Sequence, residues 1–109
     1  TGKDMALVAG ILWKRIGDGE GLYVDATLEY IVEKNGELTV QDLALDSPYN
    51  TRKYRGLPPT PISNPGLTAI LATIRPEASE YYYYLTAKDG TTIFAKTNDE
   101  HNRNKAKYL

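Results

Sequence analysis

Proline placement restricts the fold of this sequence more than any other feature. Four of the six prolines lie at positions 48, 58, 59 and 61. Proline lacks a backbone donor and is excluded from the interior of helices and from central strands. Residues 46–64 are therefore predicted to form one long irregular segment. A segment of this length without regular structure is often functional.

Helical periodicity predicts a first helix that begins near Asp4 and ends at Gly17. Gly10 lies inside it, where glycine is unfavourable, and indicates close packing against a neighbouring element. The apolar face consists of Met5, Val8, Leu12 and Ile16, widened by Ala9, Ile11 and Trp13. The broad face places this helix near the core.

Three more helices are expected before residue 76. Asp25 is placed to cap a short helix that Asn35-Gly36 would stop, and Thr39 to Asp42 has the spacing of a capping arrangement for another. The clearest helix opens at Asn64-Pro65-Gly66, with Asn64 as the cap and Pro65 in the first turn, and ends at Pro76.

The C-terminal third predicts a β-hairpin followed by a helix. Residues Tyr81–Ala87 and Thr91–Lys96 are rich in aromatic and β-branched residues, and Asp89-Gly90 between them is typical of a two-residue turn. Thr97 and Glu100 fit a capping box for a helix toward Leu109. The predicted fold class is α+β, with short helices packed on a small antiparallel sheet that includes this C-terminal hairpin.

Four consecutive tyrosines, Tyr81 to Tyr84, place two rings on each face of the first strand. They are interpreted mainly as packing residues. An aromatic platform for sugar rings is the alternative.

Composition excludes several classes of function. The chain of 109 residues has a net charge of −1 and a pI near 5.8, so no nucleic acid partner is expected. The basic clusters Arg52-Lys53-Arg55 and Arg103-Lys105-Lys107 are interpreted as solvated surface. There is no cysteine and only one histidine, His101, so neither a metal site nor a cofactor is expected. No apolar run is long enough to span a membrane, and no membrane contact by this segment is expected.

The proline-rich segment carries a specific resemblance. The stretches Asp46-Ser47-Pro48-Tyr49-Asn50-Thr51 and Gly56-Leu57-Pro58-Pro59-Thr60-Pro61-Ile62-Ser63-Asn64-Pro65-Gly66 resemble the endolytic murein transglycosylase family, also called MltG-like or YceG-like. That family's pattern reads S-P-Y-N-T-Y, then G-L-P-P-x-P-I-x-N-P-G. The resemblance continues through Val8-Ala9-Gly10 with Arg15, Leu22, Asp25 to Thr27, Phe94 and Glu100-His101-Asn102. Residues 1–109 are accordingly predicted to be the C-terminal portion of a larger catalytic domain.

The sequence departs from the family pattern at several positions. Lys14, Tyr23 and Ala26 stand where the family usually has Asn, Gln and Pro. The catalytic glutamate implied by the resemblance should precede Val8, and we expect it to lie before Thr1, so the chain alone is expected to be inactive. The stretch Ile31-Val32-Glu33-Lys34 resembles the family's I-V-E-K-E motif, which contains the catalytic glutamate. That motif should precede Val8, whereas this stretch follows Asp25. Glu33 is therefore interpreted as a solvent-facing residue at a helix end.

The resemblance implies a peptidoglycan lytic transglycosylase. Such an enzyme cleaves the bond between N-acetylmuramic acid and N-acetylglucosamine inside nascent glycan strands. It leaves 1,6-anhydro ends and stops strand elongation. The implied partners are glycan strands and peptidoglycan synthases. The implied location is the extracytoplasmic face of the bacterial inner membrane, reached through an N-terminal anchor outside this chain. The alternative is a non-catalytic peptidoglycan-binding module.

The expected substrate-binding residues combine a flat ring with amide, hydroxyl and carboxylate groups, which suit acetamido sugars. They are Tyr49, Asn50, Thr51, Asp25, Tyr23 and Asn64. Asp25 and Asn64 also have the competing interpretation of helix caps.

Overall fold

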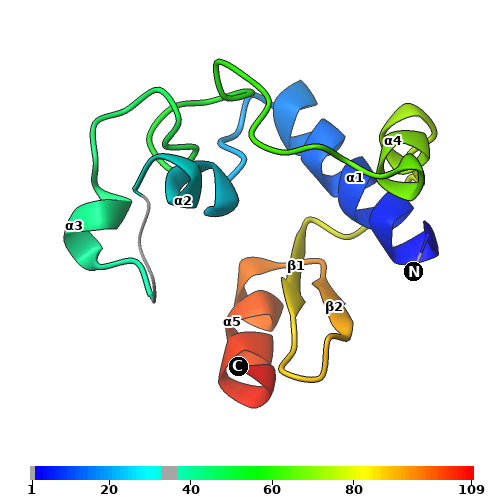
Figure 1. Ribbon diagram of the computed structural model, residues 1–109. Coiled ribbons are helices and arrows are strands. Elements are labelled where there is room, and N and C mark those ends of the chain that lie inside the picture. The colour runs from blue at the N-terminus through cyan, green and yellow to red at the C-terminus, as the bar shows by residue number, and fades with distance from the viewer. Residues whose placement is uncertain (1, 33–36) are drawn as a thin grey trace. The chain divides into compact units, whose positions relative to one another are not determined.

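A computed structural model describes residues 2–32 and 37–109 of the chain. Within these residues, five helices and one two-stranded antiparallel sheet form an α+β arrangement, as predicted (Figure 1). The described residues divide into two compact units, Thr1–Lys14 with Pro65–Leu109, and Arg15–Asn64. The predicted stop at Asn35-Gly36 and the interpretation of Glu33 lie outside the described residues.

Helix α1 (Gly2–Gly17) begins and ends close to the predicted positions. Its most buried side chains are Ile11 and Arg15, at 0% and 7% exposure, whereas Met5 on the predicted face is 44% exposed. Gly17 is the last helical residue, as predicted. The glycine that adopts the left-handed conformation common after helix ends is Gly19 (φ 73°), two residues later. The N–H groups of Gly19 and Glu20 bond back to the last turn, which closes the helix end.

The first unit packs helix α4 (Leu67–Ile74) beside α1. The Trp13 indole Nε1 donates to the Thr73 carbonyl at 3.1 Å, and the Glu77 N–H donates to Ala6. A Cβ at Gly10 would lie only 2.2 Å from the Glu77 carbonyl oxygen, so this position admits only glycine. The predicted close packing at Gly10 is confirmed.

The start of α4 differs from the prediction. Gly66 is the N-cap and makes no side-chain capping bond, so Asn64 is not the cap and Pro65 precedes the first turn. The helical conformation is disfavoured for a residue before proline, which keeps Asn64 outside the helix. Of the α4 side chains only Ala72 is buried, while Leu67 and Ile74 are about two-thirds exposed, at 71% and 68%.

Strands β1 (Tyr83–Thr86) and β2 (Thr92–Ala95) form the predicted hairpin, with Leu85 opposite Ile93. The loop between them holds three residues, because the Ala87 N–H donates to the Thr91 carbonyl across it. A two-residue type I′ turn needs positive φ at both central positions, and here Gly90 (φ 88°) has it but Asp89 does not. The two-residue turn predicted from Asp89-Gly90 is therefore wrong.

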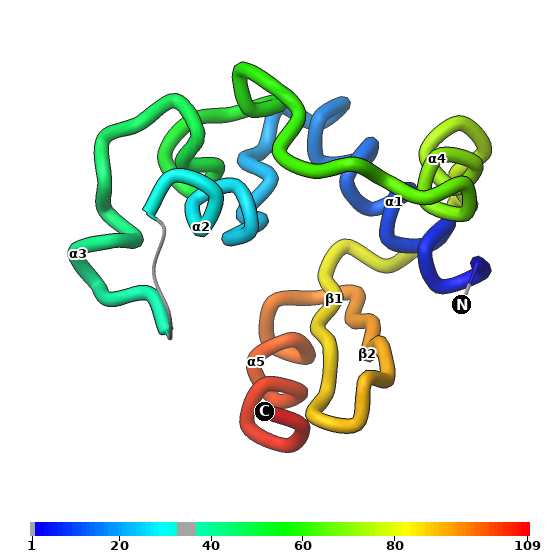
Figure 2. Tube along the Cα trace, viewed as in Figure 1, coloured from blue at the N-terminus to red at the C-terminus, as the bar shows by residue number. Residues whose placement is uncertain are grey.

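Helix α5 (Asn98–Tyr108) packs against the hairpin (Figures 1 and 2). Thr97 caps it by accepting from the Glu100 N–H, and the Glu100 carboxylate accepts from the Lys96 N–H at 2.9 Å. The His101 ring stacks on Tyr83 of β1, with centroids 5.1 Å apart. This contact attaches the helix to the sheet.

The second unit contains two short helices, α2 (Ala26–Val32) and α3 (Val40–Leu43), around buried Leu22 and Leu28. Thr39 caps α3 in a complete capping box with Asp42, as predicted. No helix in the described part of the chain is both long and apolar enough to cross a membrane.

Candidate functional site

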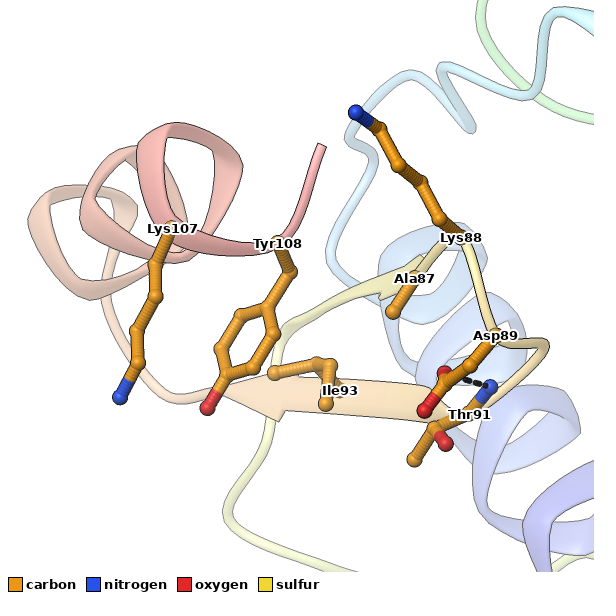
Figure 3. Close-up of a pocket in the computed structure, with 7 residues that line it drawn as sticks. All are labelled: Ala87, Lys88, Asp89, Thr91, Ile93, Lys107 and Tyr108. Carbon is orange, nitrogen blue, oxygen red and sulfur yellow. Dashed lines mark hydrogen bonds between the residues drawn. The ribbon is translucent and has the colours of Figure 1, made fainter.

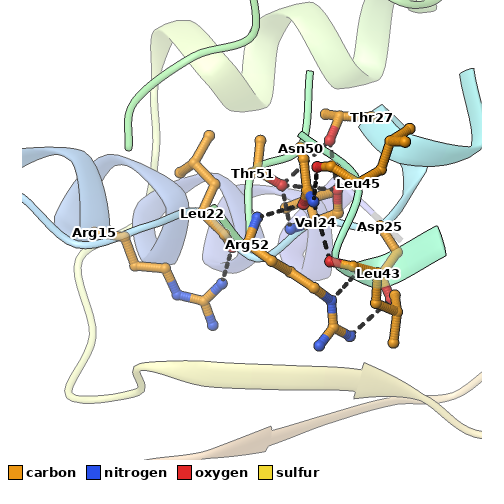
Figure 4. Close-up of polar contacts among 10 residues, drawn as sticks. All are labelled: Arg15, Leu22, Val24, Asp25, Thr27, Leu43, Leu45, Asn50, Thr51 and Arg52. Atoms are coloured by element: carbon orange, nitrogen blue, oxygen red, sulfur yellow. Dashed lines mark hydrogen bonds and ion pairs between the residues drawn. The ribbon is translucent and has the colours of Figure 1, made fainter. Parts of the chain in front are cut away.

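Three of the predicted substrate residues, Asp25, Asn50 and Thr51, lie close together at the start of the proline-rich segment (Figure 4). Asn50 is the most deeply placed of them, at 1% exposure. Its amide nitrogen donates to the carbonyls of Leu43 and Leu45 at 3.0 and 2.8 Å, and its amide oxygen accepts from the Arg52 N–H. Asn50 therefore fixes the loop backbone, because its side chain satisfies three backbone groups.

Thr51 is equally buried, at 2% exposure, and ties the loop to the segment before α2. Its hydroxyl accepts from the Val24 N–H and donates to the Val24 carbonyl, both at 3.0 Å, and lies 3.2 Å from the Thr27 hydroxyl. The Thr51 carbonyl also accepts from the Tyr23 N–H. This network aligns two segments that lie 27 residues apart in sequence.

Asp25 does not cap α2 with its side chain, which corrects that interpretation. Its two carboxylate oxygens accept from Nε and Nη2 of Arg52, at 2.7 and 3.0 Å, and both side chains remain more than a third exposed. A bidentate pair of this kind is stronger than single hydrogen bonds and fixes both planar groups in one orientation. Helix α2 is instead closed at its start by backbone N–H groups that bond to Val24 and Asp25 carbonyls.

Tyr23 is the one non-glycine residue with positive φ (53°) among the described residues, and its side chain is 58% exposed. This backbone conformation costs a tyrosine about 1–2 kcal/mol. A Cβ at Gly21 would lie 2.9 Å from the Tyr23 ring and 3.0 Å from the Thr51 carbonyl. Gly21 thus leaves room for the ring to lie against the backbone.

Tyr49 presents a ring at the outer side of the loop. Its hydroxyl forms a 2.8 Å hydrogen bond with Thr60, and its ring lies 5.6 Å from that of Tyr30, which is 49% exposed. The two rings and the Thr60 contact hold the proline-rich segment against α2.

Asn64, the remaining predicted site residue, is exposed and lies at the last position of the second unit. No hydrogen bond joins it to the other predicted site residues in the part of the chain that the structure describes. Arg52 is a site residue that the sequence did not predict, because the basic cluster that contains it has the pattern of solvated surface. Its position beside Thr51 was the available signal.

The aromatic strand in the first unit is used mainly for packing. Tyr81 stacks on Phe94 at 5.3 Å, and Tyr82 meets Tyr83 edge-on. Lys14, one of the departures from the family pattern, donates to the carbonyls of Ser79 and Tyr81 at 2.7 and 2.6 Å. These contacts favour packing over a sugar platform.

An open pocket of about 290 Å³ lies beside the hairpin loop, with Ile93 and Tyr108 on its apolar side (Figure 3). The Lys88 side chain points away from it, and the Asp89 carboxylate is engaged with the Thr91 N–H at 2.9 Å. The pocket therefore presents little polar chemistry.

Among the carboxyl groups of the described residues, three have shifted pKa values, and all three are lowered. A hydrogen bond from Tyr54, with Lys53 nearby, lowers the pKa of Asp46, and the Lys96 ammonium lowers the pKa of Glu80. The backbone N–H of Thr91 lowers the pKa of Asp89. A general acid needs the opposite shift. No group of three or more potential metal ligands occurs among residues 2–32 and 37–109.

Comparison with known proteins gives a consistent set of relatives. The YceG-like family matches residues 1–107. The endolytic murein transglycosylase of Bacillus subtilis is 36% identical over 107 residues, covering 97% of this chain and 30% of that protein. The one from Streptococcus pneumoniae serotype 2 is 30% identical over 114 residues, covering 98% of this chain and 21% of that protein.

A solved structure agrees with these relatives. The crystal structure of a YceG-like protein from Listeria monocytogenes is 40% identical and superposes with a TM-score of 0.85, over 90% of this chain and 33% of that one. The chain thus spans between about a fifth and a third of the length of the proteins it matches.

Proposed function

The chain belongs to the YceG-like family, and on that premise we propose that it forms part of the glycan-binding region of an endolytic murein transglycosylase. The observation that supports this role most is the construction of the proline-rich loop. Asn50 and Thr51 are buried beneath it and fix its backbone. The same segments carry Tyr23, whose side chain is exposed, and Tyr49, which is half-buried. A surface fixed before binding loses little conformational entropy when a ligand arrives.

The proposed role of each residue follows from how exposed its side chain is. The exposed rings of Tyr23 and Tyr30 and the half-buried ring of Tyr49 offer apolar faces to sugar rings, and the Asp25 carboxylate offers an acceptor to hydroxyl groups. Asn50 and Thr51 act as positioning residues, because their polar atoms are already engaged inside the loop. A direct sugar contact by either would first require those bonds to break.

For the whole protein, we propose cleavage of the bond between N-acetylmuramic acid and N-acetylglucosamine within nascent glycan strands. The products would carry 1,6-anhydro-N-acetylmuramic acid ends, which terminate elongation. We propose that the protein acts at the extracytoplasmic face of the bacterial inner membrane, where the strands are made. We also propose peptidoglycan synthases as partners, because they supply the strand.

A non-catalytic glycan-binding role is the second candidate. It would use the same loop, which the buried Asn50 and Thr51 hold in place. Under this alternative the loop binds the strand and leaves it intact.

The test is cosedimentation of the protein with purified sacculi, followed by mass spectrometry of the released material. We expect the 109-residue chain to cosediment. Tyr49→Ala should weaken binding about fivefold or more, since a buried ring face contributes at least about 1 kcal/mol. Tyr49→Phe keeps the ring and loses only the Thr60 hydrogen bond, so it should bind like the wild type.

The same experiment separates the two candidates. Anhydro ends released by a longer form of the protein support the transglycosylase, whereas binding without such ends in that form supports the non-catalytic module. Absence of cosedimentation by every form would overturn both.

A further inference from the structure

The Arg52–Asp25 pair lies at the surface, with both side chains more than a third exposed, and its bidentate contact holds the guanidinium in one orientation. Its guanidinium hydrogen-bonds Asp25 and no other side chain in the described ranges 2–32 and 37–109. The bond from the Arg52 N–H to the buried Asn50 amide oxygen fixes the backbone from which this side chain extends. The backbone contact with Asn50 and the side-chain contact with Asp25 together fix the orientation of the guanidinium.

The geometry of the pair leaves one edge of Arg52 turned away from Asp25. Asp25 accepts from Nε and Nη2, which form the side edge of the guanidinium (Figure 4). A guanidinium carries five donors, and the end edge formed by Nη1 and Nη2 matches a carboxylate in the same bidentate way. An arginine held by one carboxylate on its side edge can therefore receive a second carboxylate on its end edge.

Tyr23 is tied to the loop next to Arg52, because its N–H donates to the Thr51 carbonyl. The strained backbone of Tyr23 (φ 53°) holds the ring against Gly21, where it stays 58% exposed. Strain of this kind persists where the surrounding structure enforces it and is enriched at ligand sites.

We propose that Arg52 is a specificity-determining residue that binds a carboxylate carried by the glycan strand, with the Tyr23 ring beneath the adjoining sugar. This inference rests on the proposed function and names the charged group that the loop selects. Two sources share the chemistry: the lactyl carboxylate of a muramic acid without a peptide, and the carboxylates of an attached stem peptide.

The test is the affinity of the 109-residue chain for three ligands of equal sugar number, measured by isothermal titration calorimetry. They are a neutral chitooligosaccharide, a peptide-free muramyl oligosaccharide and the corresponding peptide-bearing strand. We expect at least one carboxylate-bearing ligand to bind about tenfold more tightly than the neutral one, the effect of one charge-assisted bidentate contact.

Arg52→Gln should reduce this preference to about twofold or less, while the affinity for the neutral ligand is retained. Arg52→Lys keeps the charge but not the planar fork and should give an intermediate preference. Arg55→Gln is the matched control, because it removes one neighbouring positive charge and should leave the preference intact. Unchanged affinity for the neutral ligand serves as the check that the variants fold.

The ligand that carries the preference identifies the source. Tighter binding of the peptide-free strand assigns the lactyl carboxylate, and tighter binding of the peptide-bearing strand assigns the stem peptide. An Arg52→Gln variant that keeps the wild-type preference would overturn the inference, as would an equal loss in Arg55→Gln, which would indicate diffuse charge. Failure to bind any of the three ligands would instead count against the proposed function itself.

Discussion

Replacement of Asn50 is the perturbation that most directly tests how the loop is built. Resemblance to a family motif suggests a sugar contact at this position, whereas the structure gives the side chain three internal hydrogen bonds. The two roles make different predictions. A pure sugar contact lowers affinity and leaves stability unchanged, and a buried positioning residue lowers stability in the absence of any ligand.

The magnitude follows from the bonds that are lost. Asn50→Ala deprives the carbonyls of Leu43 and Leu45 and the N–H of Arg52 of their partner at a site with 1% exposure. At about 1 kcal/mol for each hydrogen bond, the free energy of unfolding should fall by about 3 kcal/mol. A small domain is stable by only about 5–15 kcal/mol, so the loss is a large fraction of the total.

Asn50→Asp sharpens the test because it keeps the shape of the side chain. An ionised carboxylate cannot donate to the two carbonyls and is costly to bury, so the pKa of the new acid should rise in the folded state. Since the folded protein then holds its proton more tightly than the unfolded chain, the variant is most stable at low pH. Its stability should fall as the pH rises from about 4 through the raised folded value.

Urea unfolding followed by circular dichroism is the assay, with Asn64→Ala as the matched control. Asn64 is exposed and is not the cap of α4, so its replacement should change stability by no more than about 0.5 kcal/mol. Asn50→Ala should shift the midpoint by at least about 1 M urea. An unchanged midpoint for Asn50→Ala, or a larger shift for Asn64→Ala, would refute the reasoning.

Two further predictions concern packing and pH. Gly10→Ala should destabilise the first unit by more than about 2 kcal/mol, because its Cβ would meet the Glu77 carbonyl oxygen at 2.2 Å. Gly17→Ala, which would meet no atom within 4 Å, should be neutral or stabilising, and equal thermal midpoints for the two would contradict this. Asp89 should titrate below its ordinary value of 3.8, since its carboxylate accepts from the Thr91 N–H. The stabilisation is present above 3.8 and is lost as the pH falls through the lower folded value, so an NMR midpoint at or above 3.8 would contradict the assignment.

The local features of the fold could be predicted from the sequence because the interactions that produce them span a few residues. The capping box at Thr39 and Asp42, the end of α1 at Gly17 and the position of the hairpin all follow from short-range chemistry. The family resemblance was available for the same reason, since its motifs are contiguous.

Tertiary structure decided which polar groups are free to act. Asn50 and Thr51 are adjacent to Tyr49 in sequence, yet their burial depends on Leu43, Leu45 and Val24. Asp25 pairs with a residue 27 positions away, so no local pattern distinguishes a helix cap from an ion pair there. A hydrogen-bonding side chain takes the partner that the folded chain brings within about 3 Å. For that reason the sequence by itself determined the elements and the family, and only the folded loop separated its buried supports from its exposed surface.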